Sequence, residues 1–172
     1  MKVATDRLII RPFIESDLEG SHRLFILEDA MKFLGLAPAL TDISQSKDRL
    51  NKWMVDGLHH AIALPDGKFI GYITVDPDSE EDREDTKELG FALLPEYRGN
   101  GYMKEAVGAV LSHLKQENIQ YVWACCFEGN DNSENLIKNC GFTLINNGTF
   151  YVESEDYEYN SMEYRIDLKE SI

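Results

Sequence analysis

The sequence predicts a mixed α/β fold, of the α+β kind, in which helices cover both faces of one sheet. Strand-like runs are interspersed along the chain with segments that repeat apolar residues at helical spacing. In addition, two apolar strands, 89–93 and 121–125, each lead through a turn into an amphipathic helix. Repeated strand–helix units of this kind are typical of sheets that are covered by helices.

The N-terminal part of the chain is predicted to supply one strand and two helices. Residues 8–11 form an apolar strand. Ser16 and Glu19, three positions later, have the pattern of a capping box that starts the first helix. The second helix is expected at 42–54, where apolar residues recur on one face.

A hairpin and an acidic loop follow. Residues 61–64 and 69–73 flank Pro65-Asp66-Gly67, and this turn chemistry predicts two antiparallel strands. The segment 76–85 is dominated by acidic residues. Because such a segment cannot build a core, we expect it to be an exposed loop or partly disordered.

The C-terminal part is predicted to end in two more strands. Residues 142–145 form the first, and the alternating stretch 157–166 forms the second, after the turn-like sequence Asn146-Asn147-Gly148. The chain shows no internal repeat and no linker. The 172 residues, 1–172, are therefore expected to form one domain with its own core.

Bulk composition favours a cytoplasmic protein. The hydrophobic fraction is 43%, and the sequence shows neither an apolar run long enough to cross a bilayer nor a charged-then-apolar leader. Two of its three cysteines are the adjacent Cys125 and Cys126, and none has metal-ligand spacing. We expect packing roles for the cysteines, no metal and no membrane partner.

The net charge of −14 excludes nucleic acid as an expected partner, because a phosphate backbone would be repelled. A cationic substrate such as a protonated amine would instead be attracted. Acidity that serves only solubility is the alternative explanation.

The segment 98–103, Arg-Gly-Asn-Gly-Tyr-Met, carries the clearest chemical signal. It joins the strand 89–93 to an amphipathic helix, and its glycines let the backbone approach a ligand closely. The first N–H groups of the helix lack internal partners, and Arg98 adds positive charge. The segment therefore predicts a phosphate site, most plausibly for a pyrophosphate, although a simple tight turn would have the same composition.

Three motifs together resemble a known family. The segment 98–103 resembles the cofactor loop of the GNAT N-acetyltransferase superfamily, written Q/R-x-x-G-x-G/A. Asn130-x-x-Ser133, ending in Lys-x-x-Gly-Phe at 138–142, resembles the family's next block. The stretch 5–12, Thr-x-Arg-Leu-x-Ile-Arg-Pro, followed by Asp17, resembles the start of the RimJ/RimL branch, which acetylates ribosomal-protein N-termini.

This resemblance implies acetyl-coenzyme A as co-substrate, without a metal. It implies a mostly antiparallel sheet in which the strands 89–93 and 122–126 are parallel neighbours that splay apart and hold the pantetheine arm. The residues that it assigns to the cofactor are Phe91, Leu93, Arg98, Gly99, Asn100, Gly101, Tyr102, Met103, Asn130 and Ser133. The sequence departs from the family at Met103, where a small residue is usual, and at Ile137, where many relatives carry a proton-donating tyrosine.

The chemistry of acetyl transfer to an amine suggests two catalytic residues. Glu88 is the candidate base, acting through water, with a solvated residue at the end of the acidic loop as the alternative. Backbone N–H groups near Leu93 would bind the thioester oxygen. Ser133 would protonate the leaving thiolate, or else bond backbone near the helix start. Asn130 would bind the pantetheine amides or cap that helix.

The acceptor is expected to be a protein N-terminus, a polyamine or another small amine, attacked directly in a ternary complex. Of the remaining candidates, His59 and His60 are expected to be surface or packing residues. Trp53 and Phe33 fall in the region that lines the acceptor cleft in the fold that this chain resembles, but large aromatic residues at helical spacing are more often part of the core. Tyr72 and Tyr151 could contact the acceptor. A non-catalytic acyl-coenzyme A-binding or regulatory protein is the alternative function, and either a monomer or a homodimer is compatible with the sequence.

Overall fold

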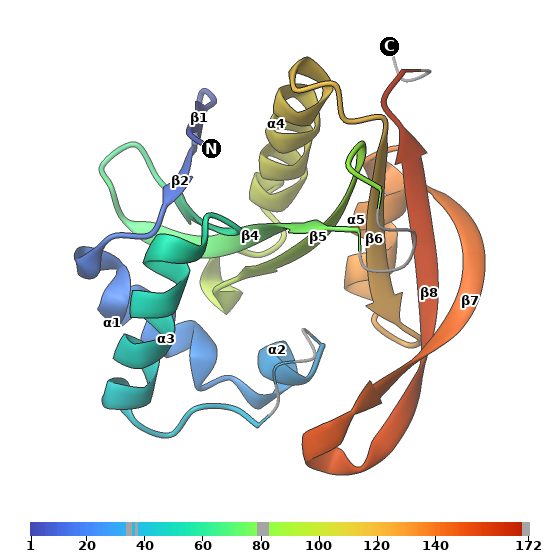
Figure 1. Cartoon of the computed structure of the whole chain (residues 1–172). Helices are drawn as coiled ribbons and strands as arrows, with labels where there is room; N and C mark the ends of the chain where they lie inside the picture. The colour runs from blue at the N-terminus through green and yellow to red at the C-terminus, as the bar shows by residue number, and fades with distance from the viewer. Residues whose placement is uncertain (34–35, 37, 79–82, 170–172) are drawn as a thin grey trace.

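The computed structural model of the protein describes residues 1–33, 36, 38–78 and 83–169. Its strands form one eight-stranded sheet in the order β1-β2-β3-β4-β5-β6-β8-β7 (Figure 1). The strands are β1 (Val3–Ala4), β2 (Ile9–Pro12), β3 (His59–Ala63), β4 (Phe69–Pro77), β5 (Thr86–Leu93), β6 (Tyr121–Phe127), β7 (Thr143–Val152) and β8 (Tyr157–Asp167). The helices are α1 (Leu18–Phe25), α2 (Glu28–Phe33), α3 (Ile43–Asp56), α4 (Tyr102–Gln116) and α5 (Asp131–Asn139).

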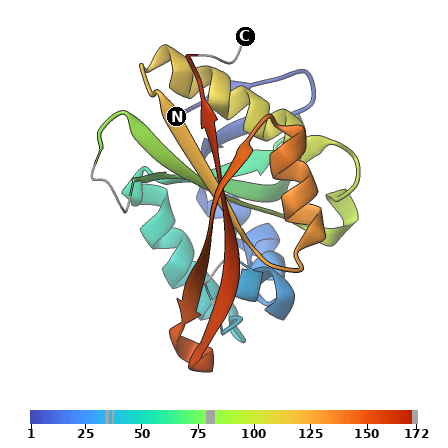
Figure 2. The same ribbon diagram turned by 90° about the vertical axis from the view of Figure 1, so that its right-hand side faces the viewer.

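Helices cover both faces of the sheet, as the sequence predicts. Helices α4 and α5 lie on one face, and α1, α2 and α3 lie on the other (Figures 1 and 2). Each face has its own apolar core. The first core packs the buried face of α4 onto strand residues such as Leu89, and the second packs Phe25 and Trp53 onto Tyr72. The apolar area buried in these two layers is the main source of stability.

The helix predicted at 42–54 is α3, and local chemistry explains where it starts and stops. Asp42 is its N-cap, and the Asp42 carboxylate accepts a hydrogen bond of 2.6 Å from the backbone N–H of Ser44. The helix ends at Gly57, whose φ of 72° is the left-handed conformation that favours glycine. The predicted hairpin is also present as β3 and β4.

The parallel pair β5–β6 separates after a short contact. All the other neighbouring pairs of the sheet are antiparallel, whereas β5 and β6 pair in parallel. The pairing joins Thr86–Glu88 to 121–123 and goes no further, although β5 continues to Leu93 and β6 to Phe127. The predicted splayed pair is therefore confirmed, and it leaves one edge of β5 open beyond Glu88.

The start of the first helix differs from the prediction. Helix α1 begins at Leu18, after a 3-10 turn at Glu15–Asp17, and no side chain caps it, so the Ser16–Glu19 capping box is not formed. Asp17 is buried instead, where it accepts two hydrogen bonds from the Arg11 guanidinium, at 2.7 and 2.8 Å. This pairing draws the turn inward and moves the helix start along the chain.

Two other segments also differ. The sequence 146–148 does not turn but continues β7, with a register shift between Leu144 and Asn146; the chain reverses later, at the 3-10 turn Glu153–Glu155. The expected acidic loop is only partly a loop, because residues 76–77 belong to β4 and Asp78 is buried. Residues 83–84 are exposed as expected, and residues 79–82 lie outside the described residues. The short elements β1 and α2 were not predicted.

Candidate functional site

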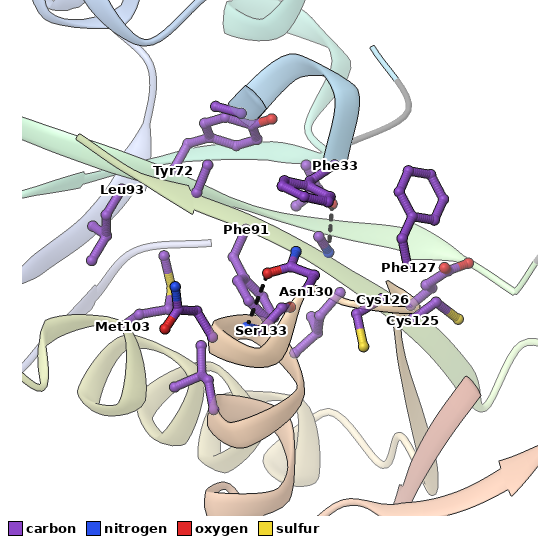
Figure 3. Close-up of a pocket in the computed structure, with 18 of the residues that line it drawn as sticks. Phe33, Tyr72, Phe91, Leu93, Met103, Cys125, Cys126, Phe127, Asn130 and Ser133 are labelled. Carbon is purple, nitrogen blue, oxygen red and sulfur yellow. Dashed lines mark hydrogen bonds between the residues drawn. The ribbon is translucent and has the colours of Figure 1, made fainter. Parts of the chain in front are cut away.

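A cavity of about 1100 Å³ passes through the gap between β5 and β6 (Figure 3). On the face covered by α4 and α5, its walls include Phe91, Met103 and Ser133. On the opposite face, they include Tyr72 and Phe33. One continuous space therefore connects the two faces of the sheet, and it does so where β5 has lost its neighbour.

The turn between β5 and α4 has the geometry of an anion site. Gly99 and Gly101 have φ of 75° and 77°, left-handed values that explain why the turn needs glycine at both positions. Gly101 is the N-cap of α4 and offers no side-chain acceptor, so the first N–H groups of the helix are left for a ligand. Arg98 and Lys104 also line this end of the cavity, and Lys104 was not predicted.

The side chains of this turn also maintain its shape. Arg98 donates from Nε to the carbonyl oxygen of Leu93 at 3.0 Å. Asn100 donates from Nδ2 to the carbonyl oxygens of Arg98, at 2.9 Å, and Tyr97, at 3.4 Å. Asn100 is thus turned towards the loop's own backbone, and it is the one predicted site residue that does not line the cavity.

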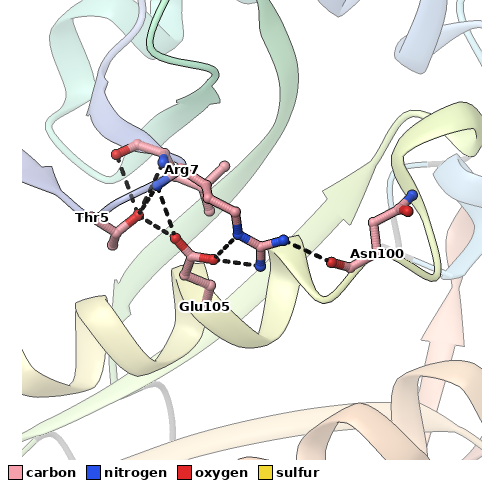
Figure 4. Close-up of polar contacts among 5 residues, drawn as sticks. Thr5, Arg7, Asn100 and Glu105 are labelled. Atoms are coloured by element: carbon pink, nitrogen blue, oxygen red, sulfur yellow. Dashed lines mark hydrogen bonds and ion pairs between the residues drawn. The ribbon is translucent and has the colours of Figure 1, made fainter.

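The N-terminal segment holds this turn from outside (Figure 4). Arg7 donates from Nη1 to the carbonyl oxygen of Asn100 at 3.1 Å and from Nε to Glu105 at 2.6 Å. Thr5 also donates to the Glu105 carboxylate, at 2.5 Å. Desolvation acts to raise the pKa of Glu105, but hydrogen bonds from Thr5 and Arg7 outweigh it, so that the pKa is lowered. The network therefore stabilises an ionised Glu105 next to the turn between β5 and α4.

The open edge of β5 presents backbone donors to the cavity. The N–H of Leu94 donates to Ile70, and that of Gly90 to the Thr74 hydroxyl, so both point towards β4. Because N–H directions alternate along a strand, those of Phe91 and Leu93 point to the other edge, where β6 has separated. Both residues line the cavity, as predicted.

Helix α5 bounds the cavity on the face of the sheet that also carries α4. Asn130 is its N-cap, and the Asn130 side-chain oxygen accepts a hydrogen bond of 3.3 Å from the backbone N–H of Ser133. Both side chains reach the cavity, and Ser133 is half-buried (Figure 3). Ile137 is 1% exposed and belongs to the apolar core. The position where many relatives carry tyrosine is therefore filled by a packing residue.

Glu88 lies at the last paired position of β5, where the gap begins. Strand alternation places it on the same face as Gly90 and Ala92, opposite Leu89 and Phe91, as predicted. Cys125, which lines the cavity across the gap, hydrogen-bonds to Glu88. Desolvation raises the pKa of Cys125 far above its usual range, and the neighbouring carboxylates add to the effect. Cys125 therefore stays a protonated thiol, and its cavity position corrects the expectation of a buried packing residue.

Carboxylates dominate the half of the cavity that faces α2. The acidic lining residues are Asp29, Asp76, Asp78, Glu88 and Glu163. The Lys and Arg side chains among the described lining residues are Arg98 and Lys104, both at the turn between β5 and α4. Charge is thus separated along one cavity, with the positive end at the turn before α4 and the negative end on the face of the sheet that carries α2.

The aromatic candidates are divided between core and cavity. Trp53 is a core residue, as expected, and Tyr151 does not line the cavity. Phe33 is 41% exposed and lines the cavity, together with Tyr72. His59 also lines the cavity, which the sequence interpretation missed. The spacing Asp56-x-x-His59 at a helix-to-strand junction was the available signal.

Among the described residues, no group of three or more histidine, cysteine, aspartate or glutamate side chains is arranged to hold a metal ion. None of the helices in the described part of the chain combines the length and apolar character that a bilayer crossing requires.

Comparison with known proteins agrees with this geometry. The sequence model of the acetyltransferase (GNAT) domain matches residues 7–143. An uncharacterised N-acetyltransferase of Bacillus subtilis, YoaA, is 25% identical over 162 residues, which cover 86% of this chain and 90% of that protein.

Two solved structures show the same fold. A GNAT-family acetyltransferase from Bacillus anthracis has a TM-score of 0.85 at 24% identity, covering 99% of this chain and 100% of that one. Spermidine N-acetyltransferase from Vibrio cholerae, solved with coenzyme A and spermine, has a TM-score of 0.78 at 15% identity, covering 96% and 98%. With a family match over most of its length and with this site, the chain belongs to the GNAT family of acetyltransferases.

Proposed function

We propose that this protein moves the acetyl group of acetyl-coenzyme A to a primary amine by direct attack, while both substrates are bound. The observation that carries the proposal is the single cavity through the gap between β5 and β6. It connects a turn suited to pyrophosphate with a carboxylate-lined space on the other face. Two substrates that enter from opposite faces would meet in the gap, already oriented for reaction.

The cofactor side fits acetyl-coenzyme A by its chemistry. The N–H groups at Gly99, Gly101 and the start of α4 would receive the pyrophosphate, with charge from Arg98 and Lys104. The uncapped helix start supports this role. The pantetheine arm would lie along the open edge of β5, near Asn130 and Met103, and Met103 is 7% exposed and lines the cavity.

The residues around the gap would carry the transfer. The backbone N–H groups of Phe91 and Leu93 would hold the thioester oxygen as negative charge develops on it. Glu88, at the start of the gap, would accept a proton from the amine nitrogen through water. Ser133 would hold the departing sulfur by a hydrogen bond and relay a proton to it.

The charge of the cavity supports a cationic acceptor. An aliphatic amine carries a proton at neutral pH, with a pKa of about 10. The carboxylate-lined half would attract such an ammonium ion and would repel an anionic acceptor. A protein N-terminus, a polyamine or another small amine would fit, whereas nucleic acid would not. The N-terminal motif at 5–12 supports the RimJ/RimL branch.

We further propose one acetyltransferase domain for residues 1–172, acting in the cytoplasm as a monomer or homodimer. The sheet supports the single domain, because it runs without interruption from β1 to β8.

An acceptor panel tests the function. Thiol release from acetyl-coenzyme A would be followed with spermidine, ribosomal-protein N-terminal peptides and an aminoglycoside, and the products would be weighed by mass spectrometry. We expect amine-dependent thiol release and a product that is one acetyl group heavier. The same amines with every primary nitrogen already acetylated are the matched controls and should give none. Absence of amine-dependent release across a broad panel would contradict the proposal.

A further inference from the structure

Asp56 and His59 form a hydrogen-bonded pair between the end of α3 and the start of β3. The imidazole Nδ1 lies 2.7 Å from the Asp56 carboxylate oxygen Oδ2. The other oxygen, Oδ1, accepts backbone hydrogen bonds from Leu58, at 2.8 Å, and from His59, at 3.2 Å. Because both its oxygens are engaged, the carboxylate is fixed in place and orients the ring.

A second contact fixes the plane of the imidazole. The ring stacks on Trp53, with a centroid distance of 3.9 Å and an interplanar angle of 13°. The His59 side chain is 17% exposed, and His59 is one of the residues that line the cavity. Since a carboxylate can only accept a hydrogen bond, the neutral imidazole in this contact would carry its hydrogen on Nδ1 and keep the lone pair of Nε2. The pair has the arrangement of a general base with its orienting acid.

The register of the sheet places His59 on the reacting face. His59 is the cross-strand neighbour of Thr74, and Thr74 is the neighbour of Gly90, which lies on the open part of β5. Directly paired residues point to the same face, so His59 shares a face with Glu88 and the acceptor half of the cavity. Two strand spacings, about 10 Å, separate the backbones of His59 and Gly90, with Thr74 between them on the same face.

We propose that His59 is the catalytic base that neutralises the incoming ammonium group. This role rests on the acetyl transfer proposed above. The N–H bond of the ammonium breaks, its proton moves to Nε2, and Asp56 stabilises the imidazolium that forms. The freed lone pair bonds to the acetyl carbon, and the carbon–sulfur bond breaks. The second nitrogen proton passes to Glu88 and then, through water and the Ser133 hydroxyl, to the released sulfur. His59 returns its proton to solvent, so one proton is released overall.

The first proton is assigned to His59 and the second to Glu88 because the two side chains differ in proton affinity. As a class, imidazole side chains take up and return protons near neutral pH more readily than carboxylates do. The ionisable groups around His59 include Asp56 on α3, Tyr72 and Asp76 on β4, Asp29 of α2 at the cavity wall, and the adjacent His60. The guanidinium of Arg49, also on α3, lies over the Trp53 ring at 6.0 Å. Burial raises the pKa of Tyr72 and, with the chain's terminal ammonium, lowers that of His60 to about 4, so both stay neutral near pH 7.

The pH dependence of two variants tests the proposal. Using the best amine of the acceptor panel, kcat/KM would be measured from about pH 6.5 to about pH 9.5 for wild-type, His59→Gln and Glu88→Gln proteins. We expect His59→Gln to lose about 10²-fold at pH 7. This loss should shrink as the pH approaches the pKa of the free amine, because the amine then arrives neutral. The loss in Glu88→Gln should persist across the range.

Three further variants separate a catalytic role of His59 from a structural one. His59→Phe preserves the stacking on Trp53 and should behave as His59→Gln does, with a normal Tm. Asp56→Asn should show the same pH trend. His113→Gln removes a matched histidine–acid pair, with Glu117 at 3.2 Å at the C-terminal end of α4, and should leave kcat/KM unchanged.

The outcomes separate the two proposals. A wild-type rate in His59→Gln or His59→Phe, or a loss of equal size at every pH, would overturn the role of His59 while leaving acetyl transfer intact. A wild-type protein that releases thiol with none of the amines would overturn the proposed function itself, and the role of His59 with it.

Discussion

Arg7 and Glu105 lie 98 positions apart in the sequence, yet the guanidinium Nη2 and the carboxylate Oε2 are 2.5 Å apart. The Arg7 guanidinium also sits 4.7 Å from the ring centroid of Tyr102 and donates to Asn100. These contacts tie the chain before β2 to the phosphate turn and the first turns of α4. The turn is thus shaped before any ligand binds, which reduces the conformational entropy that binding must remove.

Replacement of Arg7 should therefore weaken binding more than stability. The pair is partly exposed, with 49% of the Arg7 side chain and 21% of the Glu105 side chain accessible, so Arg7→Gln should cost less than about 1 kcal/mol of unfolding free energy. We expect the Kd for acetyl-coenzyme A, measured by calorimetry, to rise about fivefold. Arg83→Gln, which removes an exposed pair with Asp85, is the matched control and should leave the Kd unchanged. An unaltered Kd in Arg7→Gln would contradict this role.

Gly101→Glu should abolish acetyl-coenzyme A binding. The new carboxylate would stand at the helix start that we propose to receive the pyrophosphate, and a positive φ of 77° would strain the backbone as well. Wild-type protein should show a cofactor-dependent rise in Tm, and this variant none. Gly101→Asn controls for the strain, because asparagine tolerates left-handed conformations, and it should retain part of the shift. A normal shift in Gly101→Glu would mean that the phosphates bind elsewhere.

Glu88→Gln should lower turnover while cofactor affinity stays the same. Glutamine keeps the size of the side chain and a hydrogen-bond acceptor for Cys125 but cannot take a proton. We expect kcat to fall by about 10²-fold, the usual contribution of a positioned base. Glu128→Gln is the control, because Glu128 does not line the cavity. Unchanged turnover in Glu88→Gln would assign the proton to another carboxylate or to water.

Ser133→Ala should slow the discharge of the thiolate. We expect roughly a tenfold fall in kcat, about 1.4 kcal/mol of barrier, with little change in the Kd for acetyl-coenzyme A. The need for an acid is modest, because the leaving thiol has a pKa near 8.5. Stability should hardly change, since the cap uses the Ser133 backbone N–H and the Asn130 side chain. A loss confined to cofactor affinity would instead identify Ser133 as an anchoring residue.

Much of the fold and of the proposed cofactor site can be predicted from short sequence segments. The glycines at 99 and 101, the Asp42 cap and the hairpin at 61–73 are each determined by local backbone preferences, which the sequence shows directly. The Ser16 capping box failed for the opposite reason. Asp17 is held by Arg11 from a neighbouring strand, and this tertiary contact outweighs the local pattern.

The acceptor half could not be predicted in the same way. Asp29, His59 and Glu163 come from elements that are far apart in the sequence, and only the strand order brings them to one cavity. The continuation of β7 through 146–148 was likewise hidden. These turn-like residues pair in regular register with 161–163 of β8, just after the register shift, so the long strand pairing outweighs their local turn preference.

Two-substrate kinetics test the central claim most directly, namely that both substrates occupy one cavity when the acetyl group moves. Initial rates would be measured over a grid of acetyl-coenzyme A and acceptor amine concentrations, and the intact protein would be weighed after incubation with acetyl-coenzyme A alone. Direct attack predicts double-reciprocal lines that intersect and a protein of unchanged mass. Parallel lines, together with a protein that gains one acetyl group before the amine is added, would contradict the account.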